Sequence, residues 1–502
     1  MCLSRFRVGT SASLNECLFT GLILLALVVR CGVLAISPRA LEDDPDGYRA
    51  VAENLLRHGT FGEGNVPTAY RPPLYPLMLA PCLAMGPWGR AAIGVLHVGL
   101  GVATVWLTFR VAQRWGLGRW ALTAALLVAL DPILLRQSTL IMTETPAAFL
   151  AVAALALLTA AGRRPSAGRA LAAGACIALA ALCRPAFLPW LGLAAVILPW
   201  STAKAHGLQP VGFTGSEVIR FRVFKVFLAF IIGAAIVLAP WVVRNQLQLG
   251  RPIVSTTHGG YTLWLANNPD LYEHLRTGAW GSLWNADEFN RAWRADAPRA
   301  SPADELAADR LAYSRAWEAI RAQPGMFLYS CMVRVGGLWT PLPHQLSPDE
   351  APTTRMARYA VAVWYTVEML LAGVGALLLV RLTSKRGRTD LKSVLHGPDR
   401  RTGLKPVPHS KSSEVFKSSE VCAESAGLLA GEGPGEGALT LTLSQRERGP
   451  GWIWGLLLVV CFTGVHTLYW TDMRMRAPLV PVVAMGAAAG VAGSLGRLRR
   501  PK

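Results

Sequence analysis

The stretch FLAFIIGAAIVLAPW, residues 227–241, carries no charged side chain and decides the class of fold. Similar apolar runs lie at Leu18–Val29, Ala91–Trp106, Ala121–Leu130 and Ile453–Val465. Such runs approach the roughly 20 residues that cross the hydrocarbon core of a bilayer. The composition agrees, because 52% of the 502 residues are hydrophobic and only 16% are charged, which excludes a disordered chain and argues against a soluble enzyme. The sequence predicts an all-α polytopic membrane protein.

About ten membrane spans are predicted. They are 17–36, 91–112, 120–135, 145–161, 169–183, 186–200, 224–243, 359–381, 452–470 and 478–496. The apolar residues 74–86 are too few for a span, so we expect a helix that lies at the membrane surface or dips into it. Residues 1–36 could instead be a cleaved signal peptide, but Arg30 interrupts the apolar stretch. We expect the Arg30 side chain to extend toward the membrane interface.

The positive charges predict the orientation. With a cytoplasmic N-terminus, the short basic connections all fall on one side, as the positive-inside rule requires. They contain Arg5 and Arg7, Arg114 and Arg119, Arg163, Arg164 and Arg169, Lys204, Arg220 and Arg222, Lys385, and the tail Arg497, Arg499, Arg500 and Lys502. The opposite side receives the two longer segments 37–73 and 244–355. We therefore expect a multi-pass protein of the plasma (inner) membrane whose functional surface is extracytoplasmic.

The net charge of +19 does not indicate binding of nucleic acid, since the sequence has no basic stripe interleaved with aromatic residues. We predict membrane lipids, and no nucleic acid, as partners. The nine cysteines show no Cys-x-x-Cys motif and no clustering with histidine, which argues against a disulfide framework or a structural zinc site.

The chain divides by composition into five parts. Residues 1–243 form an N-terminal transmembrane core with the first outer segment 37–73, residues 244–355 an extracytoplasmic helical segment, residues 356–382 a further span, and residues 452–502 a C-terminal pair of spans with a basic tail. Residues 383–451 repeat KSSEV at 411–415 and 417–421 and contain few large apolar residues, so we predict a disordered cytoplasmic insertion without a catalytic role.

Both outer segments contain helix signals. In the first, Tyr48, Val51, Ala52, Leu55 and Leu56 follow helical spacing after the acidic cluster LEDDPD. In the second, Ser301 and Pro302 predict a helix start that Gln323-Pro324-Gly325 ends, and a second amphipathic run covers residues 326–339. We expect a juxtamembrane helix in the first outer segment and a small helical subdomain in the second.

Polar residues sit at the outer ends of several spans, namely Asp131, Glu144, Arg184 and Arg244. Ionisable groups at membrane depth cost on the order of 2–3 kcal/mol unless they are paired or line a wet cavity. Together with Arg71, the arginines would suit a lipid that bears a phosphate, because the guanidinium fork matches phosphate oxygens. For the first outer segment alone, an acidic solvated loop is the simpler interpretation.

An ordered set of motifs resembles a known superfamily. The motifs are D-P-D-G-Y at 44–48, R-P-P-L-Y-P at 71–76, T-E-x-P-A at 143–147, C-R-P at 183–185, P-W-x-x-R-N at 240–245, S-T-T-H-G-G-Y from 255, and the closing His466 with DMRMRAPLVP from 472. Their order is similar to that in bacterial GT-C glycosyltransferases, in the branch of protein O-mannosyltransferases and lipid A aminoarabinose transferases. The resemblance covers about 18–345 and 452–490, and Met475 departs from its R-Y-R pattern.

The resemblance implies a sugar transferase that uses a polyprenyl-phosphate sugar donor and a glycan, lipid or protein acceptor. By position, Asp44 corresponds to the catalytic carboxylate, with Asp46 as the second candidate, and Tyr48 and Glu144 to residues that orient the site. Arg71 and Arg184 correspond to donor phosphate ligands, and Arg244 is predicted to join them because of its charge at the outer end of a span. The carboxylate would take the proton of an acceptor hydroxyl while that oxygen displaces the phosphate, with inversion.

The resemblance implies no bound cofactor; the alternative is Mg²⁺ or Mn²⁺ near Asp44, which would need several convergent oxygens. For His258 and His466 we expect structural roles rather than metal ligation. Two other functions remain open. An O-antigen ligase or polymerase would carry a dominant basic loop late in the chain, and a transporter would show internal repeats and charged residues at the bilayer midplane.

Overall fold

The computed structural model describes residues 9–37, 39–205, 217–278, 282, 284–297, 301–345, 349–395 and 451–498. The chain forms two compact units, one of residues 1–378 with 446–502 and the other of residues 379–445. Among the described residues, the regular secondary structure is helical apart from one antiparallel pair, β1 (Gly62–Glu63) and β2 (Val66–Pro67). Both outer segments and nearly all of the apolar helices belong to the first unit.

Helices account for most of the described structure. The α-helices are α1 (Gly9–Ile36), α2 (Tyr48–His58), α3 (Leu74–Leu83), α4 (Gly89–Arg114), α5 (Ala121–Leu130), α6 (Pro132–Gln137), α7 (Glu144–Arg163), α8 (Ala167–Cys183), α9 (Leu188–Ala205), α10 (Glu217–Leu249), α11 (Gly259–Ala266), α12 (Pro269–Thr277), α13 (Asp287–Asp296), α14 (Pro302–Ala322), α15 (Pro324–Trp339), α16 (Pro352–Leu395), α17 (Gly451–Leu468) and α18 (Val480–Leu498). Short 3₁₀ helices are η1 (Gly86–Trp88), η2 (Gly118–Trp120), η3 (Pro185–Phe187) and η4 (Met473–Leu479).

Within the described residues, seven helical segments are long and apolar enough to cross a membrane. They are Glu16–Ile36, Gly86–Arg114, Glu144–Arg163, Arg220–Leu249, Pro352–Leu379, Gly451–Leu468 and Met473–Leu495. Shorter apolar helices, Gly118–Leu130, Ala167–Cys183 and Pro185–Ser201, occupy the other three predicted spans, and Leu74–Leu83 falls where the surface helix is predicted. The predicted class, an all-α polytopic membrane protein, is confirmed.

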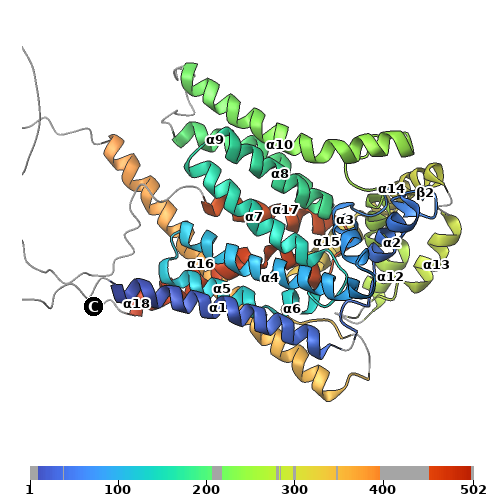
Figure 1. Cartoon of the computed structure of the whole chain (residues 1–502), viewed down its shortest axis with the longest axis horizontal. Coiled ribbons are helices and arrows are strands. Elements are labelled where there is room, and N and C mark those ends of the chain that lie inside the picture. The colour runs from blue at the N-terminus through green and yellow to red at the C-terminus, as the bar shows by residue number, and fades with distance from the viewer. Residues whose placement is uncertain are drawn as a thin grey trace, which may run out of the picture. The chain divides into compact units, whose positions relative to one another are not determined.

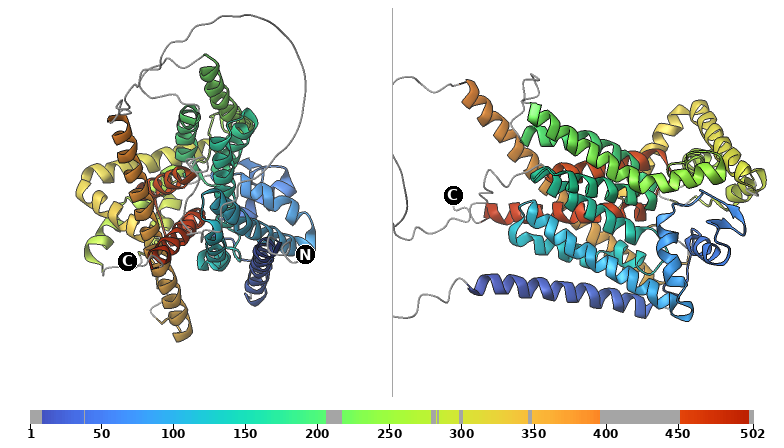
Figure 2. Two further views of the ribbon diagram at one scale, coloured as in Figure 1. Left: turned by 90° about the vertical axis from the view of Figure 1, so that its left-hand side faces the viewer. Right: turned by 45° about the horizontal axis from the view of Figure 1, so that its top comes forward.

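The two outer segments meet at one end of the helical bundle. α1, α4, α7, α8 and α10 run along its length, and α2 and α12–α14 gather beyond their ends at the right of Figure 1. Figure 2 shows the same arrangement from another side, with the yellow helices of the second outer segment near the blue ones of the first. Segments far apart in the sequence therefore share one end of the bundle.

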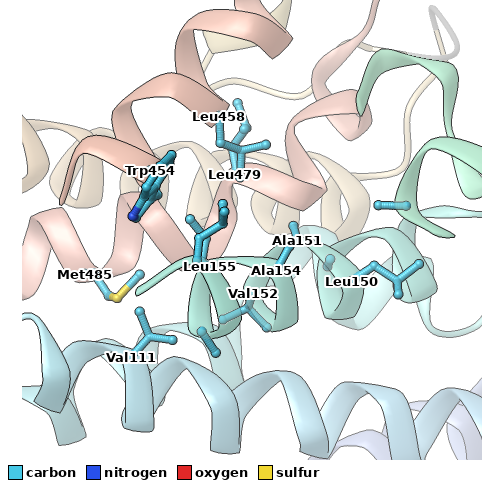
Figure 3. Packing of buried hydrophobic residues seen from close by; sticks show 14 of the residues in the cluster. Val111, Leu150, Ala151, Val152, Ala154, Leu155, Trp454, Leu458, Leu479 and Met485 are labelled. Carbon is cyan, nitrogen blue, oxygen red and sulfur yellow. The ribbon is translucent and has the colours of Figure 1, made fainter. Parts of the chain in front are cut away.

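The central helix of the bundle is α7. Buried residues make up 78% of its apolar stretch, compared with 17–56% for the other six candidate spans. Figure 3 shows Leu150 and Leu155 of α7 among Trp454 of α17, Leu479 of η4 and Met485 of α18. Because α7 begins at Glu144, its packing fixes a carboxylate at the end where the outer segments meet.

Small residues let neighbouring helices approach closely. A Cβ at Gly174 of α8 would overlap the backbone carbonyl of Phe230 in α10, and one at Gly233 of α10 would overlap that of Leu171. In a membrane the lipid is as apolar as the side chains, so the hydrophobic effect does not bring helices together. Helices there associate through close packing, which small residues at the contact allow. The contact places the end of α8, and with it Arg184, against the rest of the bundle.

The predicted span 120–135 is interrupted at Asp131. α5 ends at Leu130 and α6 begins at Pro132, because a proline cannot continue the preceding helix. Asp131 accepts the amide of Leu134 through Oδ1 at 2.8 Å and the hydroxyl of Tyr365 through Oδ2 at 3.1 Å. Its carboxylate caps a helix and joins α16 to the bundle.

The position of Arg30 differs from the expectation that its side chain extends to the membrane interface. Its side chain is buried, with 1% exposed, and donates to the carbonyls of Ala26, Val128 and Ala129. Gly101 leaves the space that the guanidinium fills, since a Cβ there would overlap it. Arg30 therefore does not extend to the interface. A carboxylate within span α16, Glu368, is also buried, so polar groups are not confined to span ends as expected.

The helix signals of the outer segments are confirmed. Ser301 accepts the amide of Asp304 at 3.2 Å and caps α14, which ends before Gln323. α15 covers the second amphipathic run, and α2 begins at Tyr48. α16 extends to Leu395, past the predicted boundary at 382. The rest of the predicted insertion, 396–450, lies outside the described residues.

Candidate active site at the outer end of the bundle

Asp44 lies shortly before α2 and caps it. Its Oδ1 accepts the amide of Tyr48 at 2.8 Å, and its Oδ2 accepts the amides of Arg49 at 2.9 Å and Ala50 at 3.2 Å. Gly47 permits this turn because its φ is 73°, in the left-handed region that glycine adopts without strain. A carboxylate at a helix N-terminus satisfies unpaired amides and complements the helix dipole. The position predicted to be catalytic thus also organises the first outer segment.

The pKa of Asp44 reflects two opposing effects. Burial raises the pKa of its carboxyl above the ordinary value, and the three amide hydrogen bonds oppose that rise. The charge of nearby Asp46 raises the pKa further. Because each carboxylate oxygen has two lone pairs and Oδ1 accepts only one amide, Asp44 retains capacity to accept a proton.

Asp46 and Arg71 form the first charged pair of the site. Asp46 Oδ1 lies 3.7 Å from Arg71 Nη2, and both side chains are partly exposed. The guanidinium of Arg71 also lies 5.6 Å from the ring centre of Tyr48 and 5.2 Å from that of Tyr70. The two rings restrict the orientation of the cation, which is attracted to their π faces.

Tyr48 is held from its other side by an aromatic pair. The ring of Tyr75 in α3 contacts Tyr48 edge-on, with centroids 5.5 Å apart. The Tyr75 hydroxyl lies 2.8 Å from His97 Nε2, and His97 Nδ1 lies 3.0 Å from the Ser138 carbonyl. Since a carbonyl only accepts, Nδ1 carries the proton and Nε2 accepts from Tyr75. This chain of contacts fixes α2 on α3 and α4.

Glu144 and Arg184 form the second charged pair. Arg184 Nη1 lies 3.0 Å from Glu144 Oε1, and the side chains are 11% and 1% exposed. The other terminal nitrogen, Nη2, contacts the sulfur of Met475. A thioether is a weak acceptor, so the guanidinium has hydrogen-bonding capacity to spare.

Arg474 brings a third guanidinium to the site, beside the same carboxylate as Arg184. Its Nε lies 3.9 Å from Glu144 Oε1 and 3.0 Å from Asp472 Oδ2. Asp472 Oδ1 accepts the amide of Arg474 at 2.8 Å and caps η4. The side chain of Arg474 is 30% exposed, so it is the more accessible of the two guanidiniums beside Glu144.

The charges of both pairs act on Tyr48. Its phenol interacts electrostatically with Arg71 and Asp46 and with Arg184 and Glu144. Burial is the main cause that raises the pKa of Tyr48 above its ordinary value. The structure thus brings together six of the seven predicted site residues, from segments as far apart as α2, α7 and the end of α8.

Arg244 is the seventh predicted residue, and the structure does not bring it into this group. Its Nη1 donates to the Thr68 carbonyl at 2.7 Å and its Nη2 to the Phe61 carbonyl at 2.8 Å. The guanidinium also lies 5.0 Å from the ring centre of Trp241. These contacts support a role in holding the first outer segment rather than the predicted role in phosphate binding.

Glu305 of α14 holds the same part of the first outer segment. It accepts the Ala69 amide at 2.9 Å, the Thr257 hydroxyl at 2.5 Å and the Thr68 hydroxyl. The side chain is only 5% exposed. Because Tyr70 and Arg71 come directly after Ala69, the second outer segment helps to position the cation that faces Asp46.

The residues around Asp44 do not fit a metal ion well. Over the described ranges, no group of three His, Cys, Asp or Glu side chains converges as a metal site would require. Both oxygens of Asp44 already accept amides. Hard cations need several convergent oxygens, and the described carboxylates do not provide such a set around Asp44. Mg²⁺ or Mn²⁺ near Asp44 stays an untested alternative that these contacts do not favour.

Some residues of the site were not identified from the sequence. Arg474 pairs with both Glu144 and Asp472, His97 supports Tyr48 through Tyr75, and Glu305 anchors the segment before Arg71. The R-M-R stretch at 474–476 is the only one of these with a sequence signal, which Met475 weakened. The others are distant in sequence from what they support.

No protein-family model and no curated protein matches the sequence. Among solved structures, the chain is similar to ArnT from Cupriavidus metallidurans bound to undecaprenyl phosphate, with 17% identity, 72% of each chain covered and a TM-score of 0.35. It is also similar to the oligosaccharyltransferase AglB from Archaeoglobus fulgidus in complex with an inhibitory peptide and a dolichol-phosphate, with 15% identity and a TM-score of 0.42. That likeness covers 95% of this chain and 50% of AglB.

Proposed function

We propose that this protein is an integral-membrane glycosyltransferase that moves a sugar from a polyprenyl-phosphate donor to an extracytoplasmic acceptor. The observation that carries the proposal is the convergence of Asp46–Arg71 and Glu144–Arg184 around Tyr48, at the end of the bundle where both outer segments meet. Carboxylates beside guanidiniums at the mouth of an apolar bundle suit a reaction of a lipid-bound phosphate with a polar acceptor.

In the proposed reaction, a carboxylate of the first outer segment takes the proton of the acceptor hydroxyl. The acceptor oxygen attacks the anomeric carbon, the bond from that carbon to the phosphate oxygen breaks, and the polyprenyl phosphate leaves with the bonding electrons. One displacement from the opposite face inverts the anomeric centre. Proton removal of this kind contributes typically about 10²–10⁴-fold to the rate.

Two carboxylates compete for the role of base. Asp44 lies at the position that the family resemblance implies, but its oxygens also cap α2. Asp46 has a single described ion-pair partner, Arg71, at 3.7 Å and keeps 28% of its side chain exposed. We propose Asp44 as the base and Asp46 as the residue that orients Arg71, with the reverse assignment as the alternative.

The guanidiniums would stabilise the charge that develops on the leaving phosphate. Arg184 and Arg71 both interact with Tyr48, one from each charged pair, and Arg474 adds a third cation beside Glu144. Donors that are already oriented toward developing charge cost no reorganisation at the moment of reaction. We therefore replace Arg244 by Arg474 in the proposed set of phosphate ligands.

The test is transfer of radiolabelled sugar from a panel of polyprenyl-phosphate sugars in membranes, with wild type and Asn variants of the first outer segment. Asp44→Asn should lower transfer at least about a hundredfold, whereas Asp43→Asn should not, because Asp43 is exposed and lies outside the charged pairs. Thermal unfolding of each purified variant separates loss of chemistry from loss of the α2 cap.

Three results would contradict parts of the proposal. If Asp44→Asn keeps full activity while Asp46→Asn is folded but inactive, Asp46 is the base and Asp44 is not. If the wild-type protein transfers sugar from none of the donors, the transferase proposal is wrong, and the ligase and transporter alternatives remain. A reporter fused after Gly47 that is found in the cytosol would contradict the proposed plasma membrane orientation, in which this segment is extracytoplasmic.

A further inference from the structure

A group of arginines lies at the end of the bundle opposite the outer segments. The candidate spans Gly86–Arg114 and Glu144–Arg163 both end there on an arginine, since α4 starts after α3 and α7 starts at the site. The short connections after these spans bring further arginines to the same end. The exposed members of this basic group are Arg110, Arg114, Arg119, Arg163, Arg164 and Arg169.

The two connections that carry the basic group contact each other. Arg163 Nη2 donates to the carbonyl of Arg114, and Arg114 Nη1 donates to the carbonyl of Ala156 in α7 at 3.4 Å. Arg169 Nη1 donates to the carbonyl of Arg164 at 2.6 Å. Main-chain carbonyls thus hold guanidiniums from both connections at one place, although their like charges repel each other.

The helices around the basic group supply no carboxylate to offset this repulsion. Residues 64–130 and 145–216, which cover both connections and the helices beside them, contain no Asp or Glu. Arg169 also lies in the first turn of α8, where the helix dipole disfavours a cation. The positive-inside rule explains the number of cations on one side of a membrane, but not their contact with one another. An anion from outside the chain would offset the repulsion.

Tryptophans indicate where this anion would lie relative to the bilayer. The guanidinium of Arg119 is 5.0 Å from the ring centre of Trp120. The ring of Trp115 is 4.6 Å from that of Trp452, whose Nε1 donates to the Trp115 carbonyl at 3.4 Å. Tryptophan is enriched at the level of lipid headgroups, and the ends of apolar spans lie at the same level. The anion nearest to hand there is the phosphate of a phospholipid.

We propose that the basic group binds the headgroups of anionic phospholipids at the membrane surface opposite the outer segments. The guanidinium fork matches phosphate oxygens, and basic sites between spans suit anionic headgroups. A phosphate seated between the two connections would contact guanidiniums from both and tie the ends of α4 and α7 to the start of α8. The inference is independent of the sugar donor, because it uses none of the residues at the outer end.

The experiment measures lipid retention by native mass spectrometry. Full-length protein is extracted from vesicles that contain equal amounts of phosphatidylglycerol and phosphatidylcholine, and the ratio of the two retained lipids is determined. Wild type should retain more phosphatidylglycerol. The triple variant Arg114→Gln/Arg164→Gln/Arg169→Gln should lower the ratio at least about tenfold, since each cation near an anionic surface contributes about fivefold to binding.

A matched control removes the same charge from α12 and α13 at the outer end. This triple variant, which should keep the ratio within about twofold of wild type, is Arg276→Gln/Arg291→Gln/Arg294→Gln.

A single variant keeps the inference testable if the triple variant at the basic group does not fold. The side chain of Arg164 is exposed and forms no hydrogen bond or ion pair with a described residue, so Arg164→Gln should fold normally and lower the ratio about fivefold. Equal retention of the two lipids by wild type would overturn the inference. So would an unchanged ratio in the folded Gln variants of the basic group, or a loss of the same size in the outer control.

Discussion

Removal of either partner of the Glu144–Arg184 pair should destabilise the protein strongly. The two charges lie 3.0 Å apart, and the side chains of Glu144 and Arg184 are 1% and 11% exposed. Loss of Glu144 would leave Arg184 without this countercharge, and loss of Arg184 would leave Glu144 only its longer contact with Arg474, at 3.9 Å. Loss of one partner of a buried pair costs about 3–5 kcal/mol. We expect Glu144→Gln and Arg184→Gln each to lower the free energy of unfolding by an amount in that range. The double variant should cost about 2 kcal/mol less than the sum of the two single costs. Steric trapping in bicelles measures the free energy of unfolding without full denaturation.

An exposed pair provides the control for this cycle. Arg276 and Glu273 of α12 are 52% and 57% exposed, and their double-mutant cycle should give a coupling below about 1 kcal/mol. If the single costs at Glu144 and Arg184 add to within about 0.5 kcal/mol, the two side chains are energetically independent and the reasoning fails. The short distance would then carry no energetic coupling, and Arg184 would have to be positioned by other contacts.

Two further predictions concern the close contact between α8 and α10 and the pH dependence of stability at Asp309. Gly174→Ala should lower the free energy of unfolding by about 1–3 kcal/mol, because its methyl group would overlap the Phe230 carbonyl. The matched variant Gly192→Ala in α9, where nothing lies within 4 Å of the added methyl group, should leave that free energy unchanged or raise it. Measured free energies of unfolding for the two variants test this difference. Burial raises the pKa of Asp309 in α14 to about 6, so the folded protein holds a proton there that the unfolded chain has lost. Wild type should therefore lose stability relative to Asp309→Asn as pH rises from about 4 to about 6, and a pH-independent difference in their unfolding temperatures would refute this.

The spans and the outer helices could be predicted from the sequence because their signals are local. The apolar run at 227–241 and the Ser301-Pro302 start both act through residues within a few positions of each other. The charged residues near span ends also indicated the site, since a charge at membrane depth is costly unless it is paired or solvated. Together with the family resemblance, which pointed to Asp44, Asp46 and Tyr48, these signals selected six residues that the structure places in one cluster, without specifying which charges pair.

The errors arise where burial depends on a distant segment. Arg30 looks like an interfacial arginine along the sequence, and only Gly101 and the carbonyls of α5 make its buried position possible. Arg244 has the same residue type and span-end position as Arg184. It faces Thr68 and Phe61 instead of a carboxylate. Hydropathy along the chain carries no information about which of two such arginines faces the site.

The R-M-R stretch shows how local geometry divides roles that the sequence groups together. Residues 473–479 form a 3₁₀ helix, in which each residue turns about 120°, so Arg474 and Arg476 cannot point the same way. Arg474 reaches Glu144, whereas Arg476 donates to the Thr340 carbonyl at 2.6 Å and lies 4.1 Å from the ring centre of Tyr365. Arg476 thereby fixes η4 to α15 and α16, and this anchoring is what holds Arg474 at the site and the Met475 sulfur on Arg184.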